Sequence, residues 1–409
     1  PNEKTAEAEG EDRLKVKRAL ISVSNKIGLD KFAEALQKLG VEIVSTGGTA
    51  RFLGEKGIKV IPVGDVTGYP EVLNGRVKTL HPAIHAAILA DRDNHDHMLT
   101  LKEQGIKPID MVVVNLYPFE EVAGKRGVAD GEVIENIDIG GPTMVRAASK
   151  NYKGVAVVTD PRRYQEIIEE LKENDNCLSD DTRLNLATQA FHTTAHYEFV
   201  IANWFSEGKA DFAPFALLDF EKVQDLRYGE NPHQRAAYYA DAGARMHLLS
   251  RVTQLHGPEL SFNNLVDINS ARLLLNEFTL PAAVIIKHNN PCGTAVAESI
   301  EHAYRKALEA DPVSAFGSVV GLNKIVDEEL AEKLSKNFIE VIVAPGYVAE
   351  AVEILTQKPK VRILVNEERR RMVSGEPDYK RVIGGMLVQD RDSGIDERDS
   401  MEVVTKKHP

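Results

Sequence analysis

The sequence predicts an α/β protein, with a doubly wound parallel sheet in its N-terminal part and a second α/β region after it. Short apolar runs of strand length alternate with amphipathic helical patterns from Arg18 onward. Short connections between such βα units favour a mostly parallel sheet with helices on both faces. Apolar residues make up 43% of the 409 residues, enough for full hydrophobic cores. A chain of this length predicts two or three domains.

The first part, residues 18–208, begins with a buried strand pattern over 19–23. Leu29, Phe32 and Leu36 then recur at helical spacing, and Gly40 stands where a glycine typically ends a helix. The other elements expected here are a strand over 41–44, a helix over 49–56, strands over 59–63, 111–116 and 154–159, and helices over 161–173 and 183–205.

Glycine, proline and charged residues interrupt this pattern at 207–214, which predicts a second domain over 209–409. The elements expected there are helices over 266–278, 300–310, 328–336 and 349–357, and strands over 282–287, 318–322, 341–344 and 361–365. From Asn366 onward the sequence is polar and charged, without a clear core pattern.

Composition narrows the possible classes of protein. The net charge of −12 argues against a nucleic-acid partner, although a few cations in one cleft could still hold a small anion. Two cysteines, Cys177 and Cys292, exclude a disulfide framework and a multi-cysteine zinc module, and they fit a reducing compartment. Residues 1–17 are charged, so we expect a flexible tail and no signal peptide. No run of 18 apolar residues exists, which predicts a cytoplasmic protein without a membrane partner.

Two loops rich in serine, threonine and glycine follow consecutive predicted strands. The first spans residues 22–28 and contains Ser22, Ser24 and Lys26, and the second contains Thr46, Gly47, Gly48 and Thr49. Either loop alone could be an ordinary turn or helix cap. Because ligands of doubly wound sheets bind beyond the carboxyl ends of the strands, the two together predict a site for a phosphate monoester. Neither loop is a Walker A or dinucleotide-binding motif.

Three further segments carry groups suited to proton transfer. Arg76, Lys78 and His81 crowd residues 74–82, Tyr117 follows the strand over 111–116, and Asp138 and Lys150 flank residues 139–149. Taken singly, Tyr117 could be a core-edge aromatic and Asp138 a helix cap. As a set they offer a phenol, a carboxylate and lysines near one sheet edge. His81 and His85 have metal-ligand spacing, but the glutamate of H-E-x-x-H is absent, so we expect no metal.

A last motif, residues 285–294, delivers Lys287 and His288 from a strand into a turn with Pro291 and Gly293. The pair could supply a base and a cation. Cys292 could instead serve as a nucleophile, although small buried cysteines are commoner than reactive ones.

These segments, in register with others along the chain, together resemble one family: the bifunctional purine-biosynthesis enzyme AICAR transformylase/IMP cyclohydrolase. AICAR is 5-aminoimidazole-4-carboxamide ribonucleotide. The matching segments are residues 22–28, 46–50, 75–82, 115–119, 137–141, 147–151, 226–234, 261–267, 287–293, 314–317 and 341–346.

The resemblance implies a methylglyoxal-synthase-like first part that closes the ring of formylated AICAR (FAICAR) to inosine monophosphate (IMP). Ser22, Ser24, Lys26 and residues 46–49 match its phosphate site. Its ring-closing site is matched by Arg76, Lys78, Thr79, Tyr117, Asp138 and Lys150.

The second part resembles the transformylase, which has a cytidine-deaminase-like fold and takes a formyl group from 10-formyltetrahydrofolate. Lys287 and His288 match its catalytic pair. Its substrate contacts are matched by Arg227, Tyr228, Asn264, Gly317 and Glu340. Because the lone Cys292 cannot hold zinc as the paired cysteines of deaminases do, we expect a metal-free transfer. The resemblance also implies a homodimer whose ligands are purine ribonucleotides and folate.

The family's transformylase region continues past the segment that matches residues 403–406, whereas this sequence ends at Pro409. We therefore expect this polypeptide, the N-terminal portion of such an enzyme, to catalyse ring closure and to be impaired in formyl transfer.

Two alternatives lie outside this interpretation. A regulatory nucleotide-binding module of the methylglyoxal-synthase-like type would need the phosphate loops only. A cysteine-dependent transferase would need Cys292 as its nucleophile.

Overall fold

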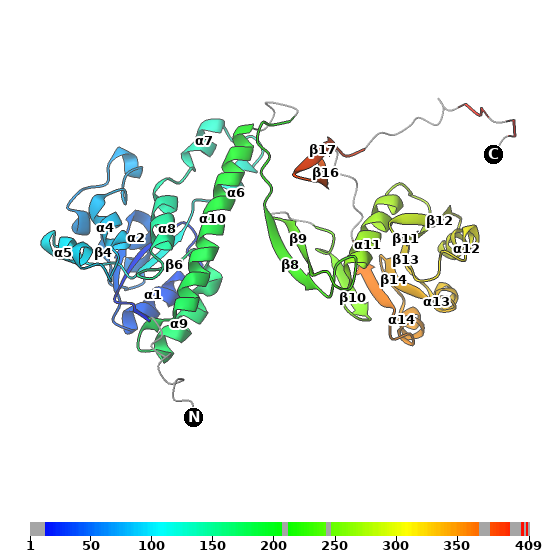
Figure 1. Ribbon diagram of the computed structural model, residues 1–409, viewed down its shortest axis with the longest axis horizontal. Helices are drawn as coiled ribbons and strands as arrows, with labels where there is room; N and C mark the ends of the chain where they lie inside the picture. Colours follow the sequence, from blue (N-terminus) through cyan, green and yellow to red (C-terminus); the bar gives the residue numbers. More distant parts are fainter. Residues whose placement is uncertain are drawn as a thin grey trace. The chain divides into compact units, whose positions relative to one another are not determined.

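The computed structural model describes residues 13–206, 212–242, 247–367, 377–392, 402–404 and 406–407. The chain divides into an N-terminal unit, Pro1–Asp219, and a C-terminal unit, Phe220–Pro409 (Figure 1). The polar break at 207–214 lies shortly before this division. The domain ranges 18–208 and 209–409 stay predictions.

The N-terminal unit is built on a five-stranded parallel sheet. In spatial order its strands are β4 (Ile61–Pro62), β3 (Glu42–Ser45), β2 (Arg18–Val23), β5 (Met111–Asn115) and β6 (Ala156–Val158). The strands are rich in buried apolar residues because both faces of the sheet are covered. The chain runs outward in both directions from β2, so the order of strands reverses between β2 and β5, where such sheets bind ligands.

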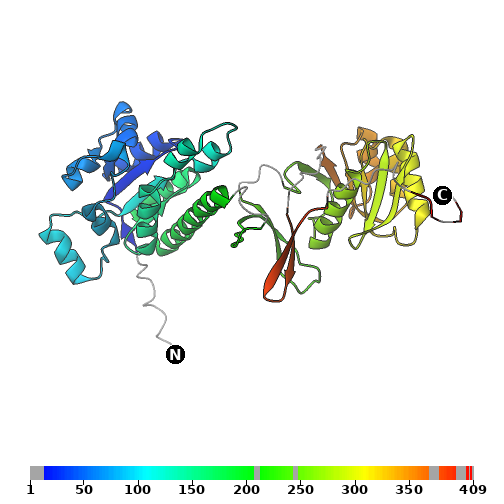
Figure 2. The ribbon, with the colours of Figure 1, turned by 90° about the horizontal axis from the view of Figure 1, so that it is seen from above.

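Helices cover both faces of this sheet, which confirms the doubly wound class (Figure 2). One face packs against α1 (Leu29–Lys38), α2 (Gly47–Glu55) and α9 (Tyr164–Glu173). The other packs against α4 (Pro82–Leu89), α8 (Gly140–Lys150) and α10 (Asp180–Ser206), and α10 also runs along α8 and β6. The shorter elements are α3 (Val63–Thr67), η1 (Leu73–Gly75), α5 (His95–Glu103), α6 (Phe119–Ala123), α7 (Asp130–Glu135) and η2 (Pro161–Arg163).

The start of the described chain differs from the expected tail over 1–17. Residues 1–12 lie outside the described residues. Leu14–Lys15 forms β1, which pairs with β7 (Cys177–Leu178), and Val16 is buried in the core. The backbone N–H of Val16 also donates to the Asn176 carbonyl at 2.8 Å. An apolar side chain and a satisfied backbone anchor the chain from Leu14 onward, within the range that its charge alone assigns to a tail.

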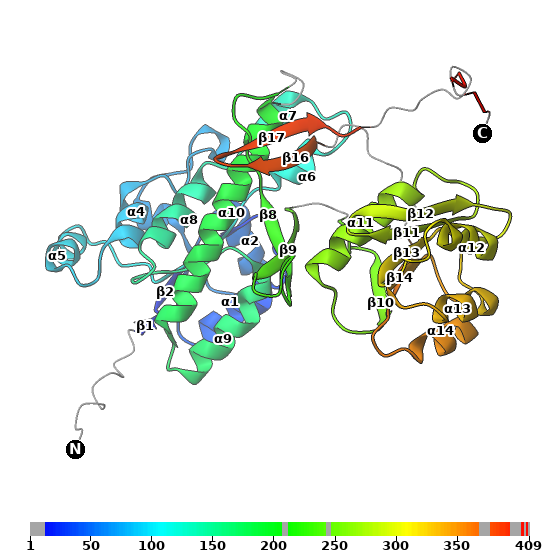
Figure 3. The same ribbon diagram turned by 45° about the vertical axis from the view of Figure 1, so that its right-hand side comes forward.

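The C-terminal unit contains a six-stranded mixed sheet (Figure 3). Its spatial order is β10 (Val252–His256), β15 (Arg362–Asn366), β14 (Ile339–Ala344), β13 (Ser318–Leu322), β11 (Ala282–Lys287) and β12 (Asn290–Val296). β13, β14 and β15 are parallel, and the other pairs are antiparallel. One face packs against α11 (Phe262–Leu275), and the other against α12 (Ile300–Ala310), α13 (Glu328–Ser335) and α14 (Ala349–Thr356).

Two hairpins complete the described part of this unit. β8 (Phe220–Leu226) pairs with β9 (Ala236–Asp241), and β16 (Pro377–Val382) pairs with β17 (Gly385–Asp390). The second hairpin lies beyond Asn366, where no core pattern was expected, and β16 is exposed along its whole length. No helix in the described parts of the chain has the length and apolarity needed to cross a bilayer.

Candidate active site

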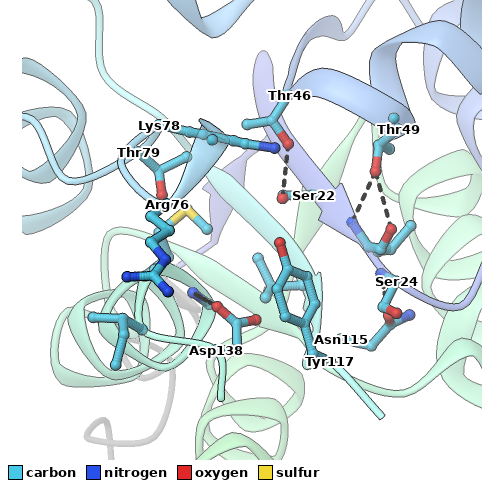
Figure 4. A pocket seen from close by; sticks show the side chains of 18 of the residues that line it. Ser22, Ser24, Thr46, Thr49, Arg76, Lys78, Thr79, Asn115, Tyr117 and Asp138 are labelled. Carbon is cyan, nitrogen blue, oxygen red and sulfur yellow. Dashed lines mark hydrogen bonds between the residues drawn. The ribbon is translucent and has the colours of Figure 1, made fainter. Parts of the chain in front are cut away.

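A cavity of about 660 Å³ opens at the carboxyl ends of β2, β3 and β5 (Figure 4). The β-strand order brings together loops that are more than a hundred residues apart in the sequence. Residues predicted from the sequence supply much of the lining: Ser22, Ser24, Lys26, Thr46, Gly48, Thr49, Arg76, Lys78, Thr79, Tyr117 and Asp138.

Hydroxyl groups join the two serine- and threonine-rich loops. Ser22 Oγ and Thr46 Oγ1 lie 2.9 Å apart in a mutual hydrogen bond. Thr49 Oγ1 accepts from the Val23 N–H at 3.1 Å and donates to the Val23 carbonyl at 3.0 Å. These contacts fix the end of β2 against the start of α2.

The second loop is also the start of α2, because this helix begins at Gly47. Thr46 precedes it in an extended conformation and makes no side-chain cap. The first N–H groups of a helix have no partner within the helix, and its dipole favours negative charge there. The N–H groups of Gly47 and Gly48 are therefore suited to bind a phosphate oxygen.

Lys78 reaches the same place from a tight turn. Gly75, with a φ of +86°, leaves room for the lysine: a methyl group there would lie 2.5 Å from Lys78 Cε. A methyl group on Gly47 would lie 3.2 Å from Lys78 Nζ, so the ammonium group stands beside the start of α2. Figure 4 shows it directed toward Thr46. The pocket therefore places a cation next to its candidate phosphate loop.

Asp138 and Thr79 are packed closely against two glycines that begin α8. The Gly141 N–H donates to Asp138 Oδ1 at 2.8 Å, so the carboxylate does cap this helix. Methyl groups on Gly140 and Gly141 would lie 2.9 Å from Thr79 Oγ1 and 2.3 Å from Asp138 Oδ2. Burial raises the pKa of Asp138, and backbone N–H groups at Gly141, Tyr117 and Gly140 partly offset the rise. The cavity thus contains a partly desolvated carboxyl group.

Tyr117 and Arg76 lie on more exposed parts of the lining. The Tyr117 side chain is 43% exposed, and Figure 4 shows its hydroxyl directed into the pocket. Arg76 forms an ion pair with Glu135 of α7, which also lines the cavity. Both groups are available to a ligand that enters from solvent.

Three residues that the sequence analysis named as candidates for the site do not line the cavity. Gly47 adjoins the lining residues without being one of them, and Lys150 is exposed at the last position of α8. At 1.5 Å per residue, Lys150 is about 15 Å along the helix from Gly140. His81 Nδ1 accepts from the Ala83 N–H and caps α4, which explains its position without a metal. Within the described residues, no group of three potential metal ligands occurs.

Asn115, at the end of β5, is a lining residue to which the sequence assigned no role. Its Oδ1 accepts from the N–H groups of Ser24 and Asn25 at 2.7 and 2.8 Å, and its Nδ2 donates to the Asn25 carbonyl at 2.9 Å. The sequence did contain a signal for this role, because Asn115 is a polar residue at the end of a buried strand, beside a predicted phosphate loop. Asn115 therefore shapes the loop that presents Ser24 and Lys26.

Asn115→Ala is expected to weaken binding of inorganic phosphate about tenfold, because the first loop loses three hydrogen bonds that order it. Isothermal titration calorimetry would measure the dissociation constant. Asn174→Ala is a matched control, since the Asn174 amide donates to the Glu170 carbonyl on α9, away from the cavity. Equal affinities of the two variants for phosphate would contradict this role for Asn115.

In the C-terminal unit, strand order gathers the other predicted residues along one edge of the six-stranded sheet. Lys287 ends β11 beside the start of β13, where Gly317 precedes Ser318, and Glu340 lies at the start of the neighbouring β14. Lys287 Nζ donates to the Phe316 carbonyl. His288 is exposed and has a φ of +50°. The catalytic pair expected from the resemblance is therefore at a turn on this edge.

Further contacts link this edge to α11 and β15. Asn264 Nδ2 donates to Glu340 Oε2 at 3.0 Å, and the Arg227 guanidinium lies 5.7 Å from the Tyr228 ring centre. Arg362, which the sequence did not single out, lies near Glu340, Arg227 and Tyr228. Burial lowers the pKa of the Arg362 guanidinium, and the charge of Glu340 partly offsets this effect. In the strand pairing, Arg362 lies opposite Val341, the residue that follows Glu340.

Cys292 has the features of a packed thiol. It lies against the apolar core, its Sγ donates to the Ile285 carbonyl, and burial raises its pKa. A raised pKa reduces the thiolate fraction, and the thiolate is the nucleophile. This environment disfavours the cysteine-dependent alternative.

Comparisons with known proteins agree with the two units. A model of the MGS-like domain matches residues 28–143, and a model of the AICARFT/IMPCHase bienzyme matches residues 148–409. The bifunctional purine biosynthesis protein PurH of Acetivibrio thermocellus is 50% identical over 397 residues, which cover 96% of this chain and 77% of the relative. PurH of Thermoanaerobacter sp. is 50% identical over 394 residues with the same coverage.

A solved structure described as "Crystal structure of ForH" is 33% identical, with a TM-score of 0.42, and covers 46% of this chain and 99% of its own. The family models and the identities to curated relatives lead to one conclusion. The chain belongs to the AICARFT/IMPCHase bienzyme family, the bifunctional enzymes of purine biosynthesis.

Proposed function

We propose that the N-terminal unit closes the ring of FAICAR to give IMP, in the cavity at the carboxyl ends of β2, β3 and β5. One observation carries the proposal: the two candidate phosphate loops and the side chains of Lys78, Tyr117 and Asp138 line the same space of about 660 Å³. A regulatory nucleotide-binding module would need only the loops.

The reaction joins two groups of one molecule. The carboxamide nitrogen attacks the formyl carbon, the formyl oxygen becomes a hydroxyl group, and that hydroxyl leaves as water with the proton of the formamide nitrogen. An amide nitrogen is a poor nucleophile, so most of the rate must come from orientation and from stabilising the developing oxyanion. Binding of the phosphate beside the hydrogen-bonded hydroxyl groups of Ser22 and Thr46 would fix one end of the substrate and so orient the reacting groups.

Each polar group in the cavity has a role in this proposal. Lys78 and Tyr117 would donate hydrogen bonds to the formyl oxygen as it gains charge. Asp138 would take a proton from the attacking carboxamide nitrogen. Lys150 is exposed at the opposite end of α8 from Asp138, so we assign it no step here and its role stays a prediction.

For the C-terminal unit we propose formyl transfer from 10-formyltetrahydrofolate to AICAR, with His288 as base and Lys287 at the tetrahedral oxyanion. In the polypeptide 1–409 this activity should be weak. His288 is exposed, and the Phe316 carbonyl competes with an oxyanion for Lys287 Nζ. The homodimer implied by the resemblance stays a prediction.

Two assays of the 409-residue polypeptide test the proposal. Absorbance should report IMP formation from FAICAR at a rate typical of enzymes, on the order of 1 s⁻¹ or more. Formyl transfer from 10-formyltetrahydrofolate to AICAR should be slower by at least about a hundredfold. IMP binding without turnover of FAICAR would favour the regulatory module, and rapid formyl transfer would contradict the proposal for the C-terminal unit.

A further inference from the structure

Glu71 is an acidic residue beside Lys78, just outside the residues that line the cavity, and neither the ring-closing chemistry nor the phosphate loops require it. It belongs to a short hairpin in which Val72 and Val77 form an antiparallel bridge, with N···O distances of 3.2 and 3.4 Å. The next opposed pair outward is Glu71 and Lys78. Opposite charges in such positions attract across a hairpin. Glu71 Oε2 lies 3.5 Å from Lys78 Nζ.

The carboxylate also stands where an anion would bind. A methyl group placed on Gly47 would lie 3.4 Å from Glu71 Oε1 as well as 3.2 Å from Lys78 Nζ. Gly47 is the first residue of α2, whose N-terminus favours negative charge. Glu71 is therefore next to both positive features of the candidate phosphate site.

We propose that Glu71 is an internal counter-ion that competes with a phosphorylated ligand for Lys78. In the free protein the carboxylate holds the ammonium group beside Gly47. A phosphate monoester carries more charge and more acceptor oxygens than a carboxylate, so it displaces Glu71 from the ammonium group and occupies the N–H groups of α2. With FAICAR bound, the released ammonium group is then free to donate to the formyl oxygen. Glu71, whose side chain is 47% exposed, then turns to solvent. The exchange lowers affinity for weak anions and favours ligands with a full phosphate group.

This inference rests on the proposed function, because it presumes that a phosphate group binds at the start of α2. It makes Glu71 a positioning and specificity residue that acts through Lys78. A purely structural glutamate would weaken binding when substituted. A competing counter-ion has the opposite effect, since its removal frees the cation for the ligand.

The test compares inorganic phosphate binding to the wild-type 409-residue chain and to Glu71→Gln by isothermal titration calorimetry at low ionic strength. The expected result is a dissociation constant about two- to fivefold lower in the variant, the range for one partly exposed ion pair. Glu34→Gln is the control: Glu34 pairs with Lys38 on α1, does not line the cavity, and its loss changes the net charge equally. Thermal unfolding of each variant would verify that it folds.

A double-mutant cycle separates competition for Lys78 from simple charge repulsion. In a Lys78→Met background, Glu71→Gln is expected to leave phosphate affinity unchanged within about 1.5-fold. Unchanged or weaker binding by Glu71→Gln alone, or an undiminished gain in the Lys78→Met background, would overturn the inference. Absence of phosphate binding to the wild-type chain would instead refute the phosphate site and, with it, the proposed function.

Discussion

Lys78→Met is expected to slow ring closure of FAICAR by about 10²- to 10³-fold, the usual effect of losing one donor to a developing oxyanion. Methionine has a similar length and keeps the contact over Gly75, but it cannot donate a hydrogen bond. Lys78 is partly exposed in a turn, so its replacement should change the free energy of unfolding little. The loss should therefore fall on kcat rather than on folding.

Single-turnover formation of IMP, followed by absorbance, measures this effect without interference from product release. Lys38→Met is a suitable control, since Lys38 is an exposed lysine of α1 that pairs with Glu34. Near-normal turnover by Lys78→Met would show that the oxyanion is stabilised elsewhere. A rise in KM alone would assign Lys78 to phosphate binding only.

Strands and helices with strong apolar periodicity could be predicted from the sequence. The strand Ala282–Lys287 and the helix Ile300–Ala310 have the expected bounds, because each buries a continuous apolar face. Where the apolar periodicity was weak, the expected and observed bounds of the elements differ more. The strand expected over 59–63 shortens to Ile61–Pro62, since proline has no N–H to donate to a neighbouring strand. The strand β16 is exposed along its whole length and so left no core signal.

The parts of the cavity nearest the strand ends were also predictable. Ser22 lies near the end of a buried strand, Thr46 and Tyr117 follow one, and parallel strands bring such positions to one edge. Lys150 lies at the other end of α8 from Asp138, because two residues close in sequence are separated by the length of a helix of 11 residues, and its catalytic role stays a prediction. Glu71 could not have been recognised, since its meeting with Lys78 depends on the pairing of Val72 with Val77.

Asp138→Asn is expected to reduce kcat by about 10²- to 10⁴-fold, the contribution typical of a positioned general base. The amide can still accept from the Gly141 N–H, so the start of α8 should keep its cap. In the wild-type enzyme the base is lost as pH falls through the pKa of Asp138, which burial raises above 3.8. The acid limb of the kcat profile should accordingly lie at higher pH than an ordinary carboxyl group would give. IMP formation measured across pH would locate it.

The same substitution should stabilise the fold, which distinguishes it from a variant that is inactive because it unfolds. A raised pKa in the folded state means that ionised Asp138 is disfavoured there relative to the unfolded chain. The stability that the protonated Asp138 carboxyl group contributes is complete at acid pH, and it is lost as the pH rises through the raised pKa of the folded state. Asparagine is neutral throughout, so its Tm should exceed that of the wild type near pH 8, and the difference should shrink as the pH is lowered. If the variant were inactive and its Tm were lower than that of the wild type both near pH 8 and at acid pH, Asp138 would have a structural role. The carboxylate would then have no part in the proposed chemistry.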